Sequence, residues 1–278
     1  MKAPGKIEDL SKLCIHTVTT KPWAIEVGAE KFAAAGVKGI TVWRDALADR
    51  KPAAIGADLR NLGLEIVSYC RGGFWPSKSK EKRELAIKDN LQMVEEAAAL
   101  GAPMIVLVCG AEPGQDLQTS RDQIKAGIEA TLPLAESHGV KLAIEPLHPM
   151  YAGDRSAINT MEQANDMAEY FKSPYVGVAV DVYHLWWDPH LEQEIERCGK
   201  SGNLHAFHIC DWKVPTNDLL LDRGIMGEGC IDVPKIRGWV EATGFSGYNE
   251  VEIFSSLYWN EDQDQYLDKI IKGYLEHS

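Results

Sequence analysis

The sequence lacks an excess of positive charge and lacks any long apolar run. Its 29 Lys and Arg residues stand against 41 Asp and Glu residues, which gives a formal net charge of −12. This charge argues against a nucleic-acid partner, whose phosphates require a basic patch, and against anionic membrane surfaces. An acidic chain can still receive an anionic substrate through a few local Arg residues. No apolar run reaches 18 residues and the N-terminal stretch has no signal-peptide core, so no membrane partner is expected.

Paired cysteines are also absent. The chain has six cysteines, and no two of them are spaced as CxxC, which argues against a thiolate zinc site. Four of them stand in or at the end of apolar strand-like runs, where buried free thiols are common. We therefore expect a reduced, cytoplasmic protein.

Apolar runs of strand length recur along the chain, with helical patterns between them. Several are nearly continuous apolar strings, which is typical of parallel strands buried on both faces. A helix is predicted over 79–102, with Gly101 as its C-cap, and another over 117–140, which Pro133 should kink or divide. The expected strands are Leu13–Val18, Val37–Trp43, Leu64–Cys70, Met104–Cys109, Lys141–Glu145, Val176–Val182, Leu204–Ile209 and Tyr248–Phe254.

Eight strand–helix units of this kind predict a (β/α)8 TIM barrel, an α/β fold, as a single domain over residues 1–278. No Pro/Ser-rich linker or low-complexity tract divides the chain. The alternative is an open, doubly wound sheet. No GxGxxG motif follows the first strand, which weakens that alternative for dinucleotide binding, and we favour the barrel.

Four polar side chains occupy the last inward position of predicted strands five to eight. Because alternate residues of a barrel strand point inward, they should meet at the carboxyl-terminal face, where barrel enzymes hold their active sites. Three clustered carboxylates would repel one another, and a divalent cation removes this repulsion. One imidazole with three carboxylates suits Mn²⁺, Mg²⁺, Co²⁺ or Fe²⁺, with Zn²⁺ kept as an alternative. The predicted ligands are Glu145, Asp181, His208 and Glu252, and Glu250 points the same way as Glu252.

The segments that carry these residues resemble the xylose isomerase-like TIM-barrel superfamily, specifically its sugar phosphate isomerase/epimerase branch. They read AIEPLHP, VAVDVYHLWWDP, AFHICDW, GEGCID and EVEIFS. The resemblance implies a metal-dependent sugar isomerase or epimerase that holds Mn²⁺ through the four predicted ligands. It implies that Glu145 and Glu252 act as acid and base on opposite faces of the substrate. His184 of the D-x-x-H pair and Arg223 after strand seven match the remaining family positions.

One position departs from the family pattern. Ketose 3-epimerases often carry E-x-L-N after strand five, whereas this chain has Glu145 followed by Pro-Leu-His148. His148 therefore adds a titratable base beside the expected metal. Some relatives cleave 3-keto-glycosides, including C-glycosides, by metal-assisted elimination with a histidine base. A lyase that uses His148 as base is the alternative to the isomerase or epimerase.

Aromatic and basic residues at the same end of the barrel are further candidates for substrate contact. Trp186 and Trp187, in the loop after strand six, would stack on a sugar ring or fill a subunit interface. His16 ends strand one. Arg44 and Arg71, after strands two and three, would either hold a phosphate or carboxylate or pair with the acidic site. Trp212 and Phe74 are the other expected walls of the pocket.

Two other classes of function are weaker. A non-catalytic sugar-binding barrel would not need a complete ligand set with bases beside it. A phosphodiesterase similar to the endonuclease IV barrels would use more histidines, several zinc ions and DNA, which the acidic chain disfavours. We expect a small sugar or keto-sugar substrate and a homo-oligomer, and we leave open a small accessory subunit.

Overall fold

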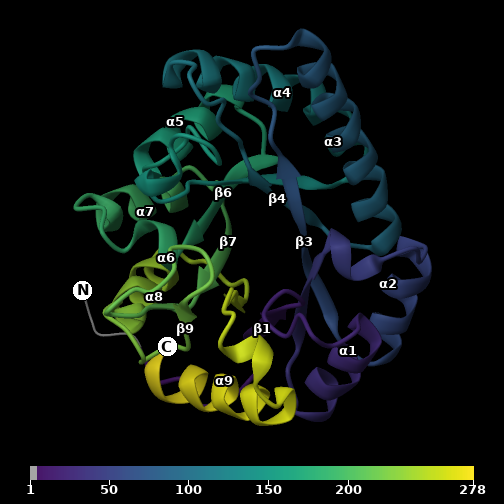
Figure 1. Cartoon of the computed structure of the whole chain (residues 1–278), viewed down its shortest axis with the longest axis vertical. Coiled ribbons are helices and arrows are strands. Elements are labelled where there is room, and N and C mark those ends of the chain that lie inside the picture. Colours follow the sequence, from purple (N-terminus) through teal and green to yellow (C-terminus); the bar gives the residue numbers. More distant parts are fainter. Residues whose placement is uncertain (1–4) are drawn as a thin grey trace.

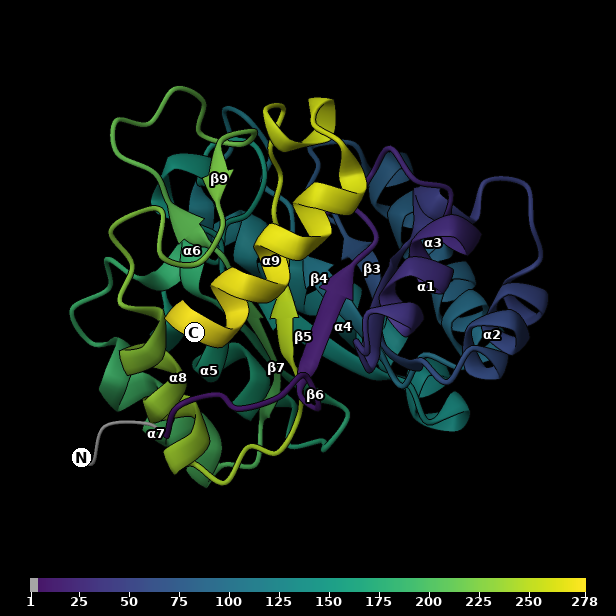
Figure 2. The same ribbon diagram turned by 90° about the horizontal axis from the view of Figure 1, so that it is seen from below.

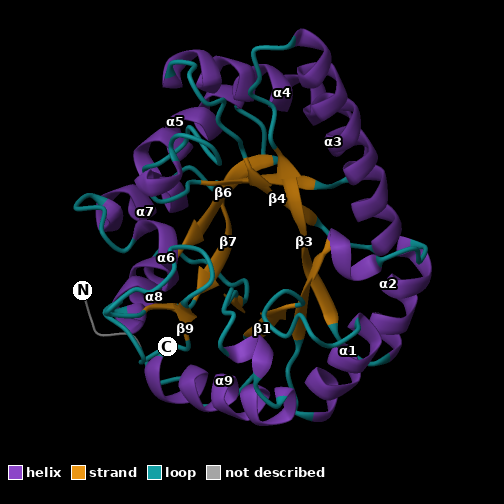
Figure 3. Cartoon of the chain, in the orientation of Figure 1, coloured by secondary structure: helices purple, strands orange, loops and turns teal. Residues whose placement is uncertain are grey.

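The computed structural model describes residues 5–278 and has a closed barrel of eight parallel strands, as predicted. Around the barrel the strands follow the order β1-β10-β7-β6-β5-β4-β3-β2. Figure 1 shows the strands at the centre of a ring of helices, and Figure 3 shows the same arrangement coloured by secondary structure. The strands are β1 (Leu13–His16), β2 (Gly39–Trp43), β3 (Glu65–Gly73), β4 (Met104–Val108), β5 (Lys141–Glu145), β6 (Val176–Asp181), β7 (Leu204–Ile209) and β10 (Asn249–Val251).

The helices pack against the outside of this barrel, and α9 crosses beside β1 in the view from below (Figure 2). A small antiparallel pair, β8 (Asp211–Trp212) and β9 (Arg223–Gly224), lies in the loop after β7. The helices are α1 (Ile25–Ala34), α2 (Pro52–Asn61), α3 (Lys80–Leu100), α4 (Leu117–His138), α5 (Met161–Phe171), α6 (Val182–Leu185), α7 (Leu191–Lys200), α8 (Val233–Ala242) and α9 (Gln263–His277), with short 3-10 turns η1 (Arg44–Leu47), η2 (Pro149–Tyr151) and η3 (Tyr258–Asn260).

Side-chain caps and glycines set the helix ends. Ser79 and Asp116 accept hydrogen bonds from the first turns of α3 and α4, and Gly101 and Gly139 end these helices with φ angles of 87° and 68°. The expected division at Pro133 is wrong, because α4 continues through it as one helix. A proline removes a single helical hydrogen bond, and the buried residues on either side keep the helix packed on the barrel.

The barrel interior has two kinds of layer near the site. A small apolar cluster, which includes Ala143, Ala179 and Ala206, fills the level below the polar residues of β5 to β7. These methyl groups leave room above them, and so the larger polar side chains fit at the carboxyl ends of the strands. The main core lies outside the barrel, between strands and helices. Within residues 5–278, no helix has the length and apolar composition needed to cross a membrane.

Close packing of α2 on α3 provides a test of the fold. A Cβ added at Gly56 would lie 1.9 Å from the Leu100 carbonyl oxygen, whereas one at Gly28 of α1 would meet nothing closer than 3.8 Å. We expect Gly56→Ala to lower the free energy of unfolding by about 1–3 kcal/mol, because a backbone must shift. Gly28→Ala, the matched control, should be neutral or stabilising by up to about 1 kcal/mol through helix propensity. Urea unfolding of both variants measures this, and equal stabilities would contradict the packing.

Candidate active site

The four residues predicted as metal ligands meet at the carboxyl-terminal mouth of the barrel. Glu145 and Asp181 end β5 and β6, His208 lies in β7, and Glu252 directly follows β10. One ligand-type atom from each residue lies within 4.8 Å of the others, and all four side chains are buried. We call this set the ligand cluster. Strand register accounts for part of it, since Asp181 pairs with His208 across β6 and β7.

The ligand cluster carries more negative than positive charge. Burial by itself would lower the pKa of His208, but the hydrogen bond with Glu145 and the charges of Glu250 and Glu252 raise this pKa to about 10. Burial raises the pKa of Asp181 in spite of the nearby Arg223 cation. Both shifts reflect carboxylates crowded in a site that excludes water. A mixed nitrogen and oxygen donor set with this excess of negative charge fits a divalent cation.

Arg223 is the cation most closely tied to the ligand cluster. Its Nη1 donates to Asp181 Oδ2 at 3.0 Å and to Glu252 Oε2 at 2.8 Å. Its Nη2 lies 3.1 Å from His184 Nε2. The guanidinium is buried and lies 4.3 Å from the centre of the Tyr183 ring. Arg223 therefore holds two carboxylates and one imidazole in fixed positions.

A second layer supports the ligand cluster from below. The His16 ring joins two glutamates, with Nδ1 3.1 Å from Glu252 Oε1 and Nε2 3.2 Å from Glu250 Oε2. The same Glu250 oxygen accepts hydrogen bonds from Thr41 at 2.6 Å and Ser68 at 3.1 Å. His16 is completely buried. The structure thus places it between the two glutamates, and Glu250 stands one level below Glu252.

His184 has one ring nitrogen in use and one without a partner. Arginine only donates, so His184 Nε2 accepts the hydrogen bond from Arg223 and Nδ1 carries the proton. Burial and the Arg223 charge keep the pKa of His184 well below its usual value, and so the ring is neutral. The buried Nδ1 has no hydrogen-bond partner among the described residues. A buried N–H group usually has a partner, so this atom stands out among the polar groups of the site.

A cavity of about 130 Å³ opens above the ligand cluster. A second, more open hollow adjoins it and shares three of its walls, namely Trp43, Arg71 and Phe254. Together the two spaces form the candidate substrate pocket. The lining of the cavity is Trp43, Arg71, Val108, Glu145, Leu147, Tyr151, Arg155, His184, Leu220, Arg223, Glu252 and Phe254.

Comparison with known proteins identifies the family. The family model described as Xylose isomerase-like TIM barrel matches residues 29–272. The chain belongs to this family. No curated protein matches the sequence.

Solved structures agree with this assignment. The crystal structure of protein SMc04130 from Sinorhizobium meliloti 1021 is 44% identical, covers 96% of this chain and 98% of that chain, and has a TM-score of 0.92. The IolI protein with a binding zinc atom is 20% identical over 95% and 97%, with a TM-score of 0.84. The apo 3-keto-D-glucoside 4-epimerase YcjR from E. coli is 18% identical over 94% and 98%, with a TM-score of 0.77. The last two show a shared fold.

Several predicted contacts lie outside the cavity lining. Trp186 and Trp187 directly follow α6 and are half-buried. His148 lies against the Trp187 and Trp212 rings, at centroid distances of 5.5 and 5.3 Å. These four residues form an aromatic platform beside the pocket. Phe74 is exposed and lines neither hollow, whereas Arg44 pairs with Asp89 and Glu96 and lines only the second, more open hollow.

Sequence reasoning missed other residues of the site, including Phe254. Trp43 and Arg155 line the cavity, and Thr41 and Ser68 hold Glu250. Trp43 and Thr41 stand at the end of a predicted strand, so inward alternation along β2 contained a usable signal. Arg155 lies in the loop after η2 and had no comparable signal.

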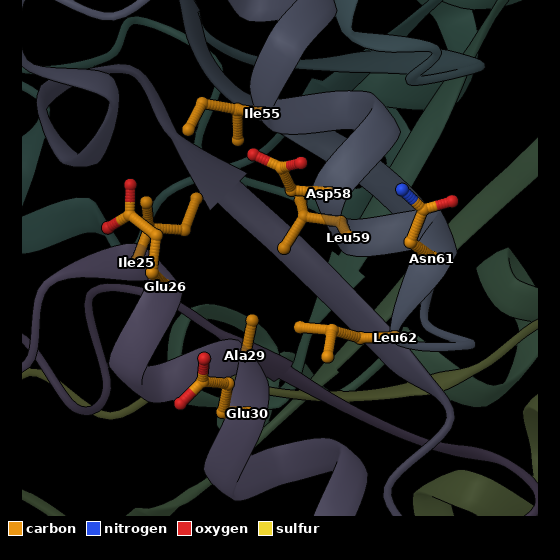
Figure 4. A pocket seen from close by; sticks show the side chains of 9 residues that line it. All are labelled: Ile25, Glu26, Ala29, Glu30, Ile55, Asp58, Leu59, Asn61 and Leu62. Carbon is orange, nitrogen blue, oxygen red and sulfur yellow. The ribbon is translucent and has the colours of Figure 1, made fainter.

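Another hollow, of about 330 Å³, lies between α1 and α2 on the outer face of the barrel. Figure 4 shows its side chains, which include Glu26, Glu30 and Asp58 among apolar neighbours. It has no histidine, cysteine or cation in its lining. The ligand cluster and its cavity are therefore the candidate active site.

Measuring the metal bound by two variants tests whether the ligand cluster is a metal site. We expect Asp181→Asn to lower the affinity for Mn²⁺ strongly, because a charged ligand is lost. Glu250→Gln, one level below, should retain bound metal with an affinity loss of at most about 10–100-fold, as for residues that support a ligand. Elemental analysis and Mn²⁺ titration of the folded variants measure both. If Asp181→Asn held metal as tightly as the unchanged chain, the ligand assignment would be wrong.

Proposed function

We propose that this protein is a divalent-metal-dependent sugar isomerase or epimerase that removes a proton from carbon next to a carbonyl. The observation that carries the proposal is the position of two glutamates. Glu145 and Glu252 line the same cavity, and β6 and β7 separate their strands in the barrel. Two carboxylates on different sides of one substrate suit removal of a proton and its return.

Glu145, Asp181, His208 and Glu252 would hold the metal, with Mn²⁺ as our first choice. The IolI protein, which shares this fold, binds a zinc atom, and this supports a metal-binding role for the ligand cluster. When bound, the cation supplies Lewis-acid stabilisation of negative charge that develops on the substrate oxygens. A proton on carbon is only weakly acidic, and so its removal needs such stabilisation.

Glu252 is held in its ionised form. Burial would raise its pKa, but the Arg223 cation and the hydrogen bond from His16 hold the pKa of Glu252 well below its usual value. The carboxylate is therefore ionised at neutral pH. Glu145, on the other side of the cavity and in its protonated form, would give its proton to the opposite face of the substrate in an epimerisation, or to the neighbouring carbon in an isomerisation. Glu252 would then carry the abstracted proton, and exchange with water would reset both carboxyl groups.

The other groups in the cavity would position the substrate. The unpartnered N–H of His184 would donate to a hydroxyl or carbonyl oxygen. Trp43 and Phe254, with ring centroids 5.2 Å apart, form an apolar wall on which a sugar ring would pack. These rings also exclude water from the reacting carbon, which strengthens the electrostatic effect of the buried charges.

The orientation of His148 disfavours the elimination alternative. Its Nδ1 accepts a hydrogen bond from the Met150 N–H at 3.2 Å. The neutral ring therefore carries its proton on Nε2, which cannot accept another. Burial lowers the pKa of His148, so the neutral form predominates at neutral pH. We infer that His148 donates a hydrogen bond at the edge of the pocket and is not the base.

A homo-oligomer, an accessory subunit and a cytoplasmic location remain predictions.

Proton exchange in D₂O tests the proposed function. Metal-loaded protein is incubated with free, phosphorylated and 3-keto sugars, and deuterium incorporation is measured by mass spectrometry. At least one ketose should exchange the hydrogen next to its carbonyl. Glu252→Gln should lose this exchange by at least the ~10²–10⁴-fold of a missing general base. Failure of every sugar to exchange would disprove the proposed reaction.

The variant His148→Asn distinguishes the isomerase or epimerase from the lyase, because only the lyase would use His148 as its base. Asn can still donate a hydrogen bond, so we expect exchange within about tenfold of the unchanged chain, less than the ~10²–10⁴-fold expected for a lost base. The metal content of each variant is measured alongside. A His148→Asn variant that holds its metal but releases no aglycone from 3-keto-glycosides and exchanges with no sugar would favour the lyase.

A further inference from the structure

Two arginines of the cavity have no hydrogen-bond or ion-pair partner among the described residues. Arg71 and Arg155 both line it. Over residues 5–278, neither guanidinium makes an ion pair with a carboxylate or a hydrogen bond with any group. Arg223, in the same cavity, is fully engaged with Asp181, Glu252 and His184. The two free guanidinium groups thus make no direct contact with a carboxylate, although Glu145 and Glu252 line the same cavity.

Local structure aims Arg71 at the cavity. The register between β3 and β4 shifts between Cys70 and Gly72, so Arg71 is an extra residue in β3. Such bulges redirect a side chain and are common beside active sites. The guanidinium lies 5.7 Å from the centre of the Trp43 ring and 4.7 Å from that of Phe74. These rings hold the charge at the mouth without neutralising it.

Arg155 is held by a loop with many internal hydrogen bonds. Its backbone N–H donates to the Tyr151 carbonyl at 3.0 Å, and its guanidinium lies 5.3 Å from the Tyr151 ring centre. The Tyr151 hydroxyl donates to the Leu219 carbonyl at 2.8 Å, which joins this loop to the one after β8. The next residue, Ser156, pairs with Gly110 after β4. Arg155 therefore stands on a well-anchored loop.

The positive charges of Arg71 and Arg155 lie around the same cavity and repel each other. Burial and the charge of Arg155 both lower the pKa of Arg71. Like charges around a partly enclosed cavity repel, and an anion between them relieves the repulsion. Arginine is suited to this role because its planar fork binds phosphate or carboxylate oxygens in pairs. Arg44, by contrast, is satisfied by Asp89 and Glu96.

We propose that Arg71 and Arg155 bind an oxyanion group of the substrate, a phosphate or a carboxylate. The inference rests on the proposed function in naming the substrate class: a ketose phosphate or a keto-sugar acid. The carbonyl end would lie at the ligand cluster and the anion at the two arginines. The adjoining hollow extends the pocket beyond Arg71, and its lining includes Lys21 and Asp45.

The arginine pair is tested without turnover. Inorganic phosphate is titrated into the full chain by calorimetry after metal removal, so that phosphate cannot bind through a metal. The unchanged chain should bind phosphate, and Arg71→Gln and Arg155→Gln should each weaken binding by about 10–100-fold. Lys88→Gln, which removes one exposed charge from α3, is the matched control and should change nothing. Absence of binding, or equal binding in all four proteins, overturns the inference.

Matched substrates separate this inference from the proposed function and distinguish the two anions. Deuterium exchange is measured for a free ketose, its phosphate and the corresponding keto acid. One anionic member should exchange with a kcat/KM at least about tenfold above the free sugar, and Arg71→Gln should remove this advantage through KM. Exchange of free and anionic sugars at equal rates, unchanged in Arg71→Gln, would leave the isomerase standing and overturn the anion site. If no sugar exchanges, the proposed function fails and the phosphate titration decides the anion site.

Discussion

The mouth of the barrel is built around buried carboxylates that repel one another. Glu145, Asp181, Glu250 and Glu252 are all at most 4% exposed and lie at the ends of barrel strands. Water does not screen their charges, so positive groups must stand close to them. Arg223 meets Asp181 and Glu252, and the His16 ring lies between Glu250 and Glu252. The remaining excess of negative charge is the physical reason to expect a divalent cation.

The hydrogen bonds around these carboxylates also fix their directions. Asp181 Oδ1 accepts the Tyr183 N–H at 2.7 Å, which makes this residue the cap of α6 and leaves its second oxygen for Arg223. One oxygen of Glu250, Oε2, forms hydrogen bonds with three side chains, those of His16 in β1, Thr41 in β2 and Ser68 in β3. A site whose side chains are held in this way needs little reorganisation during a reaction.

The loops at the mouth are joined to one another as well as to the barrel. The hydroxyls of Tyr151 and Tyr183 both donate to the Leu219 carbonyl, at 2.8 and 2.9 Å. Asp211 accepts hydrogen bonds from four backbone N–H groups, three of them in the loop after β9. The aromatic platform contacts Tyr183, whose ring stacks on Trp212 with centroids 4.6 Å apart. Its tryptophans pack against one another and against His148, and Trp43 and Phe254 line the cavity.

The strands of the barrel and the polar residues at their carboxyl ends follow from local sequence. Continuous apolar strings predicted parallel strands, and alternation along each strand predicted that Glu145, Asp181, His208 and Glu252 would share one end. The helix end at Gly101 followed from its position after the last apolar turn. Period and polarity are properties of short segments, so the sequence by itself determined them.

Tertiary structure decided which groups complete the site. His16 and Glu250 are 234 positions apart, and Thr41 and Glu250 are 209 apart, yet each pair is in contact because closure of the barrel sets β1 beside β10. Arg71 reaches the cavity through a shift in strand register, and Arg155 through the path of a loop. The hydrogen bond from the Met150 N–H to His148 Nδ1, which disfavours His148 as a base, also depends on the folded path of its loop. Such contacts depend on the meeting of distant segments or on the course of a loop, which no local pattern encodes.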